Sequence, residues 1–136
     1  MRLSYLEVHR IVDASASAVW DLLIDTTRWP VWGPSVSAVE CPDRFIHEGS
    51  RGRVKTSLGV WVPFAVTAFR PGYYWSWRVF DLPATDHRVD PLPLERCRLT
   101  FAVPTVAAPY LTVCRIAMVR IEHLVLGSGE QPKSPG

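Results

Sequence analysis

His87 is the residue of this sequence best suited to chemistry. It stands between Thr85 and Val89, and the alternation of this segment predicts a strand on which the three side chains share the inward face. An imidazole in an apolar cavity can act as an acid or a base near neutral pH. It can also bond a neighbouring backbone group or a water and only shape the cavity, or contact a polar part of a ligand. We therefore assign no residue a catalytic role. His87 is the candidate for general acid–base catalysis if the protein is an enzyme.

Other arrangements that support catalysis are weak. Asp21 and Asp25 stand four residues apart on an expected helix, where they fit a solvated surface and a cap better than an acid–base pair. Cys97 would form a nucleophilic pair with His87 only if the two side chains touched. The sequence has no Ser-His-Asp order, no Gly-rich phosphate loop and no metal-ligand spacing. No cofactor and no metal site are predicted.

Six tryptophans give the chain a large aromatic content for its 136 residues. Each indole brings a wide apolar surface and one N–H group that needs a partner. The rings can fill a core or line a pocket, and composition does not decide between the two. We expect at least three of the inward aromatic side chains to contact a cavity. The side chains in question are Trp32, Phe64, Trp75, Trp77 and Phe101.

Length and composition fit one domain without covalent staples. The chain is 48% hydrophobic, and a chain of this length buries roughly two thirds of its unfolded surface. The expected ligand-binding domain spans 1–127, and the segment 128–136, which lacks apolar residues, is expected to be a disordered tail. The net charge of +2 argues against nucleic acid, and no apolar run is long enough for stable membrane insertion.

The three cysteines, Cys41, Cys97 and Cys114, form neither a CxxC pair nor an even-numbered framework. Free thiols are therefore expected, and these are typical of a reducing compartment. The N-terminal residues also lack the apolar core of a signal peptide. Together these features predict a cytoplasmic protein.

The first forty residues predict one strand and two short helices. The segment 5–12 is rich in strand-forming residues. Ser15 is a suitable N-cap for a helix that stops near Asp25, because its hydroxyl can accept from the unpaired N–H groups of the first turn. A second helical turn must also be short, since Pro30 and Pro34 interrupt it.

Six further segments have the period of two that is typical of strands, and their short connections predict an antiparallel meander. Trp77 is expected to lie opposite His87 across a loop formed by residues 81–83. A slip by one residue would place Arg78 there and bury its charge, which is costly. The expected strands after the first lie near 36–40, 51–57, 60–68, 73–80, 85–89 and 96–103.

The last element returns to a helical period over Pro109 to Leu126, with Gly127 as its C-terminal cap. Arg115 and Glu122 are expected to face water, opposite an apolar stripe that faces the sheet. One such helix must cover seven strands, so the sheet must curl and leave a space for a hydrophobic small molecule. Its predicted contacts are Trp32, Phe64, Val66, Trp75, Trp77, His87, Leu99, Phe101, Tyr110 and Cys114.

Two stretches, VDASASAVWDLLID at 12–25 and WPVW at 29–32, resemble the opening of the START-like superfamily, also called SRPBCC. The resemblance covers residues from about 3 to 126, and polyketide cyclase/dehydrase-like members are the most similar. It implies the α+β helix-grip fold, a curved seven-stranded antiparallel sheet around a long C-terminal helix, with two short helices after the first strand.

The resemblance leaves three functions open. The first is binding of a lipid- or polyketide-like molecule in an internal cavity. The second is a polyketide cyclase or dehydrase that uses His87 as acid or base, and the third is a protein-interaction module. A homodimer and an acyl carrier protein are partners left open. An anionic partner of this kind would use basic side chains that otherwise form a solvated sheet face: Arg51, Arg53, Lys55, Arg78, Arg88, Arg96 and Arg98.

Overall fold

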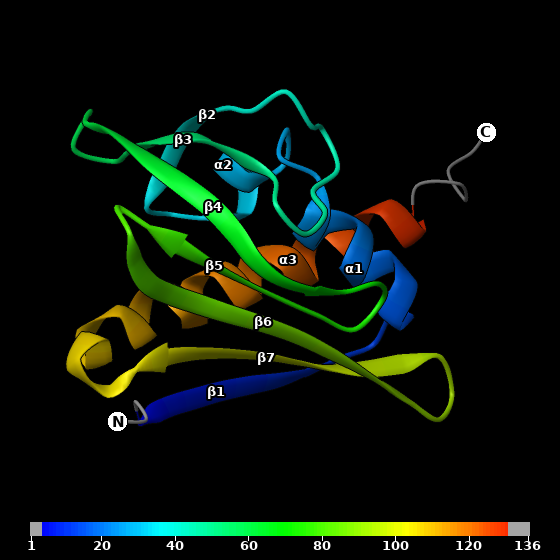
Figure 1. Cartoon of the computed structure of the whole chain (residues 1–136). Coiled ribbons are helices and arrows are strands. Elements are labelled where there is room, and N and C mark those ends of the chain that lie inside the picture. The colour runs from blue at the N-terminus through cyan, green and yellow to red at the C-terminus, as the bar shows by residue number, and fades with distance from the viewer. Residues whose placement is uncertain (1–3, 131–136) are drawn as a thin grey trace.

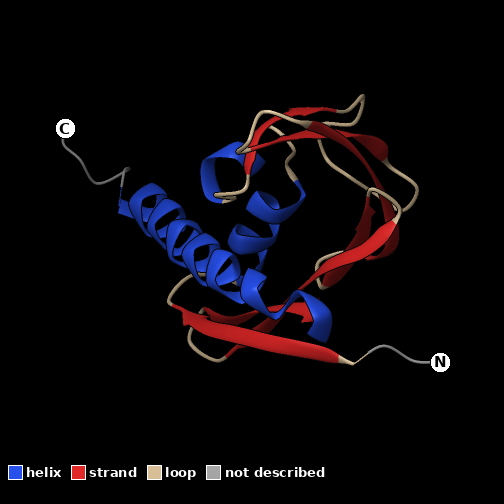
Figure 2. Ribbon diagram, turned by 90° about the vertical axis from the view of Figure 1, so that its left-hand side faces the viewer, coloured by secondary structure: helices blue, strands red, loops and turns tan. Residues whose placement is uncertain are grey.

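A seven-stranded antiparallel sheet curves around one long helix in the computed structural model, which describes residues 4–130 (Figures 1 and 2). The strand order is β1-β7-β6-β5-β4-β3-β2, so the first strand closes one edge beside the last. This architecture confirms the predicted helix-grip fold. The elements are β1 (Tyr5–Val12), α1 (Ala16–Ile24), α2 (Trp29–Trp32), β2 (Val36–Glu40), β3 (Arg51–Thr56), β4 (Trp61–Arg70), β5 (Tyr74–Val79), β6 (Leu82–Leu92), β7 (Arg96–Pro104), the 3-10 helix η1 (Thr105–Tyr110) and α3 (Leu111–Glu130).

The two short helices are held together by local hydrogen bonds. The Ser15 hydroxyl accepts from the backbone N–H of Ala18 at 3.2 Å, so Ser15 is the predicted N-cap of α1. The indole N–H groups of the WPVW segment donate back to α1. Trp29 bonds the carbonyl oxygen of Leu23, and Trp32 that of Leu22, both at 2.9 Å. These bonds satisfy carbonyls near the end of α1 and fix α2 against it.

The predicted pairing of Trp77 with His87 is wrong, because Trp75 lies opposite His87. The β5–β6 turn has only two residues between Val79 and Leu82, not the predicted three-residue loop. A bulge then places two residues of β6 opposite Trp77. The extra residue moves the register by one, so the inward phase of both strands is kept despite the shorter turn.

A second bulge reverses the inward phase near the end of β4. The register shifts between Val66 and Ala68. The alternation that would have turned Ala68 inward ends there, and Phe69 packs against the core. The Phe69 ring meets the edge of Trp20 with 5.6 Å between centroids. The sequence signal of alternation is lost here because one residue of the strand is left unpaired.

Helix α3 differs at both ends from its predicted limits. Pro109 lies inside η1, and the α-helix begins only at Leu111. The helix continues past Gly127, the predicted cap, to Glu130. Residues 131–136 of the predicted tail lie outside the described residues.

The faces of α3 largely follow the predicted stripe. Cys114 and Ile121 are buried against the sheet, whereas Arg115 is exposed. Glu122 does not simply face water, because its Oε1 accepts two hydrogen bonds from Arg10 of β1, from Nε at 3.0 Å and from Nη2 at 2.8 Å. The three cysteines are free thiols, as predicted. Within the described residues, no helix is long and apolar enough to cross a membrane.

An apolar cavity as the candidate functional site

An apolar cavity of about 430 Å³ opens between the sheet and the start of the helical C-terminal segment. It lies at the end of the molecule where the β3–β4 turn, the β5–β6 turn and η1 come together, which we call the cavity end (Figure 1). Its wall is mostly aliphatic. The lining residues are Ser35, Val36, Val54, Thr56, Ser57, Leu58, Val62, Trp77, Val79, Leu82, Pro83, Ala84, Val103, Pro104, Ala107 and Tyr110.

The apolar wall is interrupted by the hydroxyl-bearing residues Ser35, Thr56, Ser57 and Tyr110. The hydroxyls of Ser35 and Tyr110 form a hydrogen bond of 2.6 Å between the α2–β2 connection and η1. Burial raises the pKa of Tyr110, so this phenol keeps its proton at neutral pH. The indole Nε1–H of Trp77 is buried and has no hydrogen-bond partner among residues 4–130. A buried donor without a partner costs folding free energy.

His87 is packed in the aromatic core and is not among the lining residues. Its side chain is 3% exposed and stacks on Trp75 with 3.9 Å between ring centroids. The imidazole also meets the Phe101 ring edge to face, with 4.9 Å between ring centroids. Its Nδ1–H donates to the carbonyl oxygen of Trp75 at 3.2 Å. Burial lowers the pKa of His87 to about 3. The imidazole is therefore neutral at physiological pH and bonds a neighbouring backbone group.

The aromatic core explains why the cavity lies at one end of the grip. Trp29 stacks on Trp75 with 5.5 Å between centroids and an interplanar angle of 8°. Phe64 meets the Trp29 ring at 5.4 Å, and Trp32 meets Phe101 at 6.1 Å. These large rings fill the centre of the space between the helices and the sheet. The apolar cavity lies where the strand ends carry smaller valine, alanine and proline side chains.

Of the ten predicted ligand contacts, the structure places Trp77 and Tyr110 on the cavity wall. The others lie in the core behind it and do not line the cavity: Trp32, Phe64, Val66, Trp75, His87, Leu99, Phe101 and Cys114. Among the five aromatic candidates, Trp77 alone belongs to the lining, not the expected three or more. Cys97 is buried and forms no described contact with His87, and burial raises its pKa to about 11.

Sequence reasoning missed most of the real lining, which comes from strand ends. Val54 and Val62 lie directly opposite each other on β3 and β4, and Val103 and Ala107 flank the β7–η1 junction. A usable signal was present, because Val54 and Val62 belong to the inward phase of their strands. Small apolar residues at the same end of several strands leave space that rings would fill.

A second hollow lies at the opposite end, beside α1 and the β6–β7 turn, and carries the carboxylates of Asp13, Asp21, Asp25 and Glu95. Burial alone would raise the pKa of Asp25, but bonds from Arg44 and Thr27 outweigh it and lower this pKa. Asp25 thus holds the α1–α2 connection to the loop around Arg44. No group of three or more metal-ligating side chains occurs among residues 4–130.

A curved antiparallel sheet that grips a long helix over an apolar cavity places the chain in the helix-grip class of hydrophobic ligand-binding folds. The family described as polyketide cyclase / dehydrase and lipid transport matches residues 5–115. The chain belongs to this family. A search of curated proteins finds no match.

Solved structures share the fold at low sequence identity. Truncated norcoclaurine synthase from Thalictrum flavum is 12% identical over 92% of this chain and 94% of its own, with a TM-score of 0.70. The hypothetical protein jhp0584 from Helicobacter pylori is 13% identical over 90% of this chain and 88% of its own, with a TM-score of 0.74. XoxI from Bacillus cereus is 10% identical over 91% of this chain and 96% of its own, with a TM-score of 0.72.

Proposed function

We propose that this protein binds a hydrophobic small molecule in the apolar cavity at the cavity end of the molecule. The observation that carries the proposal is the cavity itself, with its aliphatic wall and its few polar groups at fixed positions. Pockets of this size and composition are typical of small-molecule sites, in which apolar walls give affinity and a few polar groups give orientation.

The polar groups suggest what the ligand carries. The Ser35–Tyr110 pair offers hydroxyls that can donate or accept. A ligand with a lipid- or polyketide-like apolar body and one carbonyl or hydroxyl group matches this arrangement. No ionised group of the ligand is required, because the lining residues include no charged side chain.

Binding without catalysis is the better-supported form of this function. A cyclase or dehydrase would need a group that exchanges protons near neutral pH and contacts the substrate. His87 was the candidate for that role. Its low pKa and its place behind the cavity wall support a structural role instead.

A cavity-filling variant tests the proposal. Val62→Phe adds a ring to a lining residue, and Val31→Phe makes the same change on α2, where the side chain is exposed. With the dye 1-anilinonaphthalene-8-sulfonate as probe, Val62→Phe should weaken binding about tenfold, or about 1.4 kcal/mol. Val31→Phe should bind like the unaltered protein. Native mass spectrometry of freshly purified protein should show a co-purified ligand that Val62→Phe lacks.

Equal dye binding by the two variants and the unaltered protein would contradict the proposal. It would show that the dye binds elsewhere on the surface. Thermal unfolding of both variants controls for misfolding, since each should unfold in one cooperative transition.

A further inference from the structure

The cavity end carries exposed apolar side chains on separate turns. Leu58 on the β3–β4 turn is 89% exposed, Phe80 on the β5–β6 turn is 68% exposed, and Val106 in η1 is 90% exposed. Leu82, next to Phe80, is 65% exposed. Leu58 and Leu82 also line the cavity, so these tips form its rim. Large apolar side chains gathered around one opening indicate an interaction surface.

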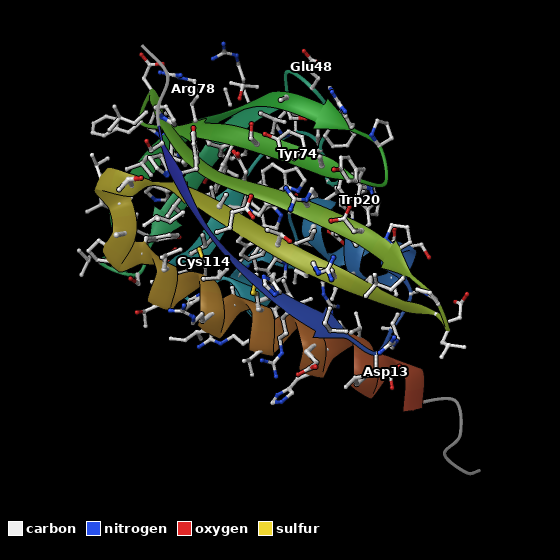
Figure 3. All side chains as sticks on the ribbon, turned by 90° about the horizontal axis from the view of Figure 1, so that it is seen from below. Asp13, Trp20, Glu48, Tyr74, Arg78 and Cys114 are labelled. Carbon is white, nitrogen blue, oxygen red and sulfur yellow. The ribbon has the colours of Figure 1, made fainter. Side chains whose placement is uncertain are left out.

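Few charged residues of the described part of the chain belong to the segments at this end. The segments 56–69 and 99–114 contain no charged residue, and the β5–β6 turn contains only Asp81. Arg78 is the partner of Asp81: its guanidinium donates to the Asp81 carbonyl oxygen at 2.7 Å and lies 3.4 Å from the carboxylate, which is 99% exposed. Figure 3 shows Arg78 at this end of the sheet, with Asp13 at the other.

Two cations stand next to these uncharged segments in the chain. Lys55 is the penultimate residue of β3, just before the turn that carries Leu58, and Arg115 lies in the second turn of α3. Neither forms an ion pair with any residue in the described part of the chain. Apolar tips with two unpaired cations next to them in the chain match a surface that is apolar inside and anionic outside, which is the arrangement of an acidic lipid bilayer.

Phe80 also occupies a backbone position that does not suit it. It is the first residue of a two-residue hairpin turn and has a φ of +55°. Such turns prefer asparagine or glycine, and a bulky residue with positive φ is strained. The position therefore presents a large apolar ring to solvent at a cost to folding, which is offset if the ring leaves water on docking.

We propose that the cavity end docks reversibly on an anionic membrane surface, with Phe80, Leu58 and Val106 entering the interface. The tips come from three separate segments, the β3–β4 turn, the β5–β6 turn and η1, so we choose a lipid surface over a second copy of the chain as the occupant. This inference goes beyond the proposed ligand binding, since docking needs the tips and not the cavity.

The β6–β7 hairpin supplies a matched control. Leu94 has a φ of +67°, is the second of the three residues of the β6–β7 turn and is 84% exposed, but it lies at the opposite end of the sheet. Phe80→Asn and Leu94→Asn each replace an exposed apolar residue with one that tolerates positive φ. Both variants should therefore fold at least as well as the unaltered protein.

Flotation with lipid vesicles tests the proposal. The unaltered protein should float with vesicles of phosphatidylcholine containing about one third phosphatidylserine, and less with phosphatidylcholine alone or at high salt. Phe80→Asn should lower the partition coefficient about tenfold, since a phenylalanine side chain loses its burial. Leu94→Asn should float like the unaltered protein. Val62→Phe should also float normally, which separates docking from cavity binding.

Three results would overturn the proposal. The first is no binding of the unaltered protein to either kind of vesicle. The second is an equal loss in Leu94→Asn and Phe80→Asn. The third is a dimer in sedimentation velocity that Phe80→Asn converts to a monomer, which would assign the cavity end to a second copy of the chain.

Discussion

The buried neutral imidazole makes the stability of this protein depend on pH in a specific way. Burial lowers the pKa of His87 from 6.5 to about 3. Because the folded-state pKa is the lower one, the contribution to stability is fully present above pH 6.5 and is lost as the pH falls toward 3. Between pH 7 and pH 5 the unfolded chain takes up a proton that the folded chain does not. At about 1.4 kcal/mol per pH unit below 6.5, this lowers the free energy of unfolding by about 2 kcal/mol.

Urea unfolding at pH 7 and pH 5 measures this loss. The variant His87→Phe keeps an aromatic ring against Trp75 but cannot titrate, so its free energy of unfolding should fall about 2 kcal/mol less than that of the unaltered protein. Its stability at pH 7 is lower or similar, because the bond to the Trp75 carbonyl is lost while the ring contact is kept. Because each protein is compared with itself at pH 7 and pH 5, this offset in the free energy of unfolding drops out of the comparison.

His9→Gln is the matched control, since it removes a histidine that is exposed on β1. It should show the pH dependence of the unaltered protein. If His87→Phe and the unaltered protein lose the same free energy between pH 7 and pH 5, the imidazole is not held neutral in the core. The assignment of His87 to a structural role would then be wrong.

Two further substitutions test the packing of the helices. Ile121 is fully buried on α3, so Ile121→Ala should lower the free energy of unfolding by about 2–5 kcal/mol in urea titrations. Arg115→Glu, on the exposed side of the same helix, should change it by less than about 0.5 kcal/mol, and equal effects would refute the assignment of faces. Ser15→Ala should cost about 1 kcal/mol through loss of the α1 cap, whereas Ser15→Asn should retain most of the stability. If both changes at Ser15 cost the same, the side-chain bond to Ala18 does not stabilise the helix.

The order of elements follows from local patterns in the sequence. Alternation over the segments after Val36 predicts strands, and the helical period of the last segment predicts a helix, because each pattern reflects one element facing one apolar core. The limits of β1 and β2 agree with prediction to the residue. The limits of α3 do not, because a 3-10 turn containing Pro109 and a glycine inside a helix are decided by packing beyond the local sequence.

The register of β5 with β6 needed the tertiary structure. The sequence predicts that Trp75, Trp77 and His87 share the inward face, and burial of Trp75 and His87 agrees with this. It does not reveal that the turn has two residues or that a bulge restores the phase. A short turn and a bulge produce the same alternation as a longer turn without a bulge, so the pattern alone cannot separate them.

By itself, the sequence determined that an apolar sheet must close around an apolar helix. Only the tertiary structure decided where the space between them remains. Rings from Trp29, Trp75 and Phe64 interlock in the centre, so the predicted central pocket around His87 is filled, and the cavity lies where small side chains meet at the strand ends. The location of a cavity depends on which side chains meet across different elements, and neither composition nor periodicity contains that information.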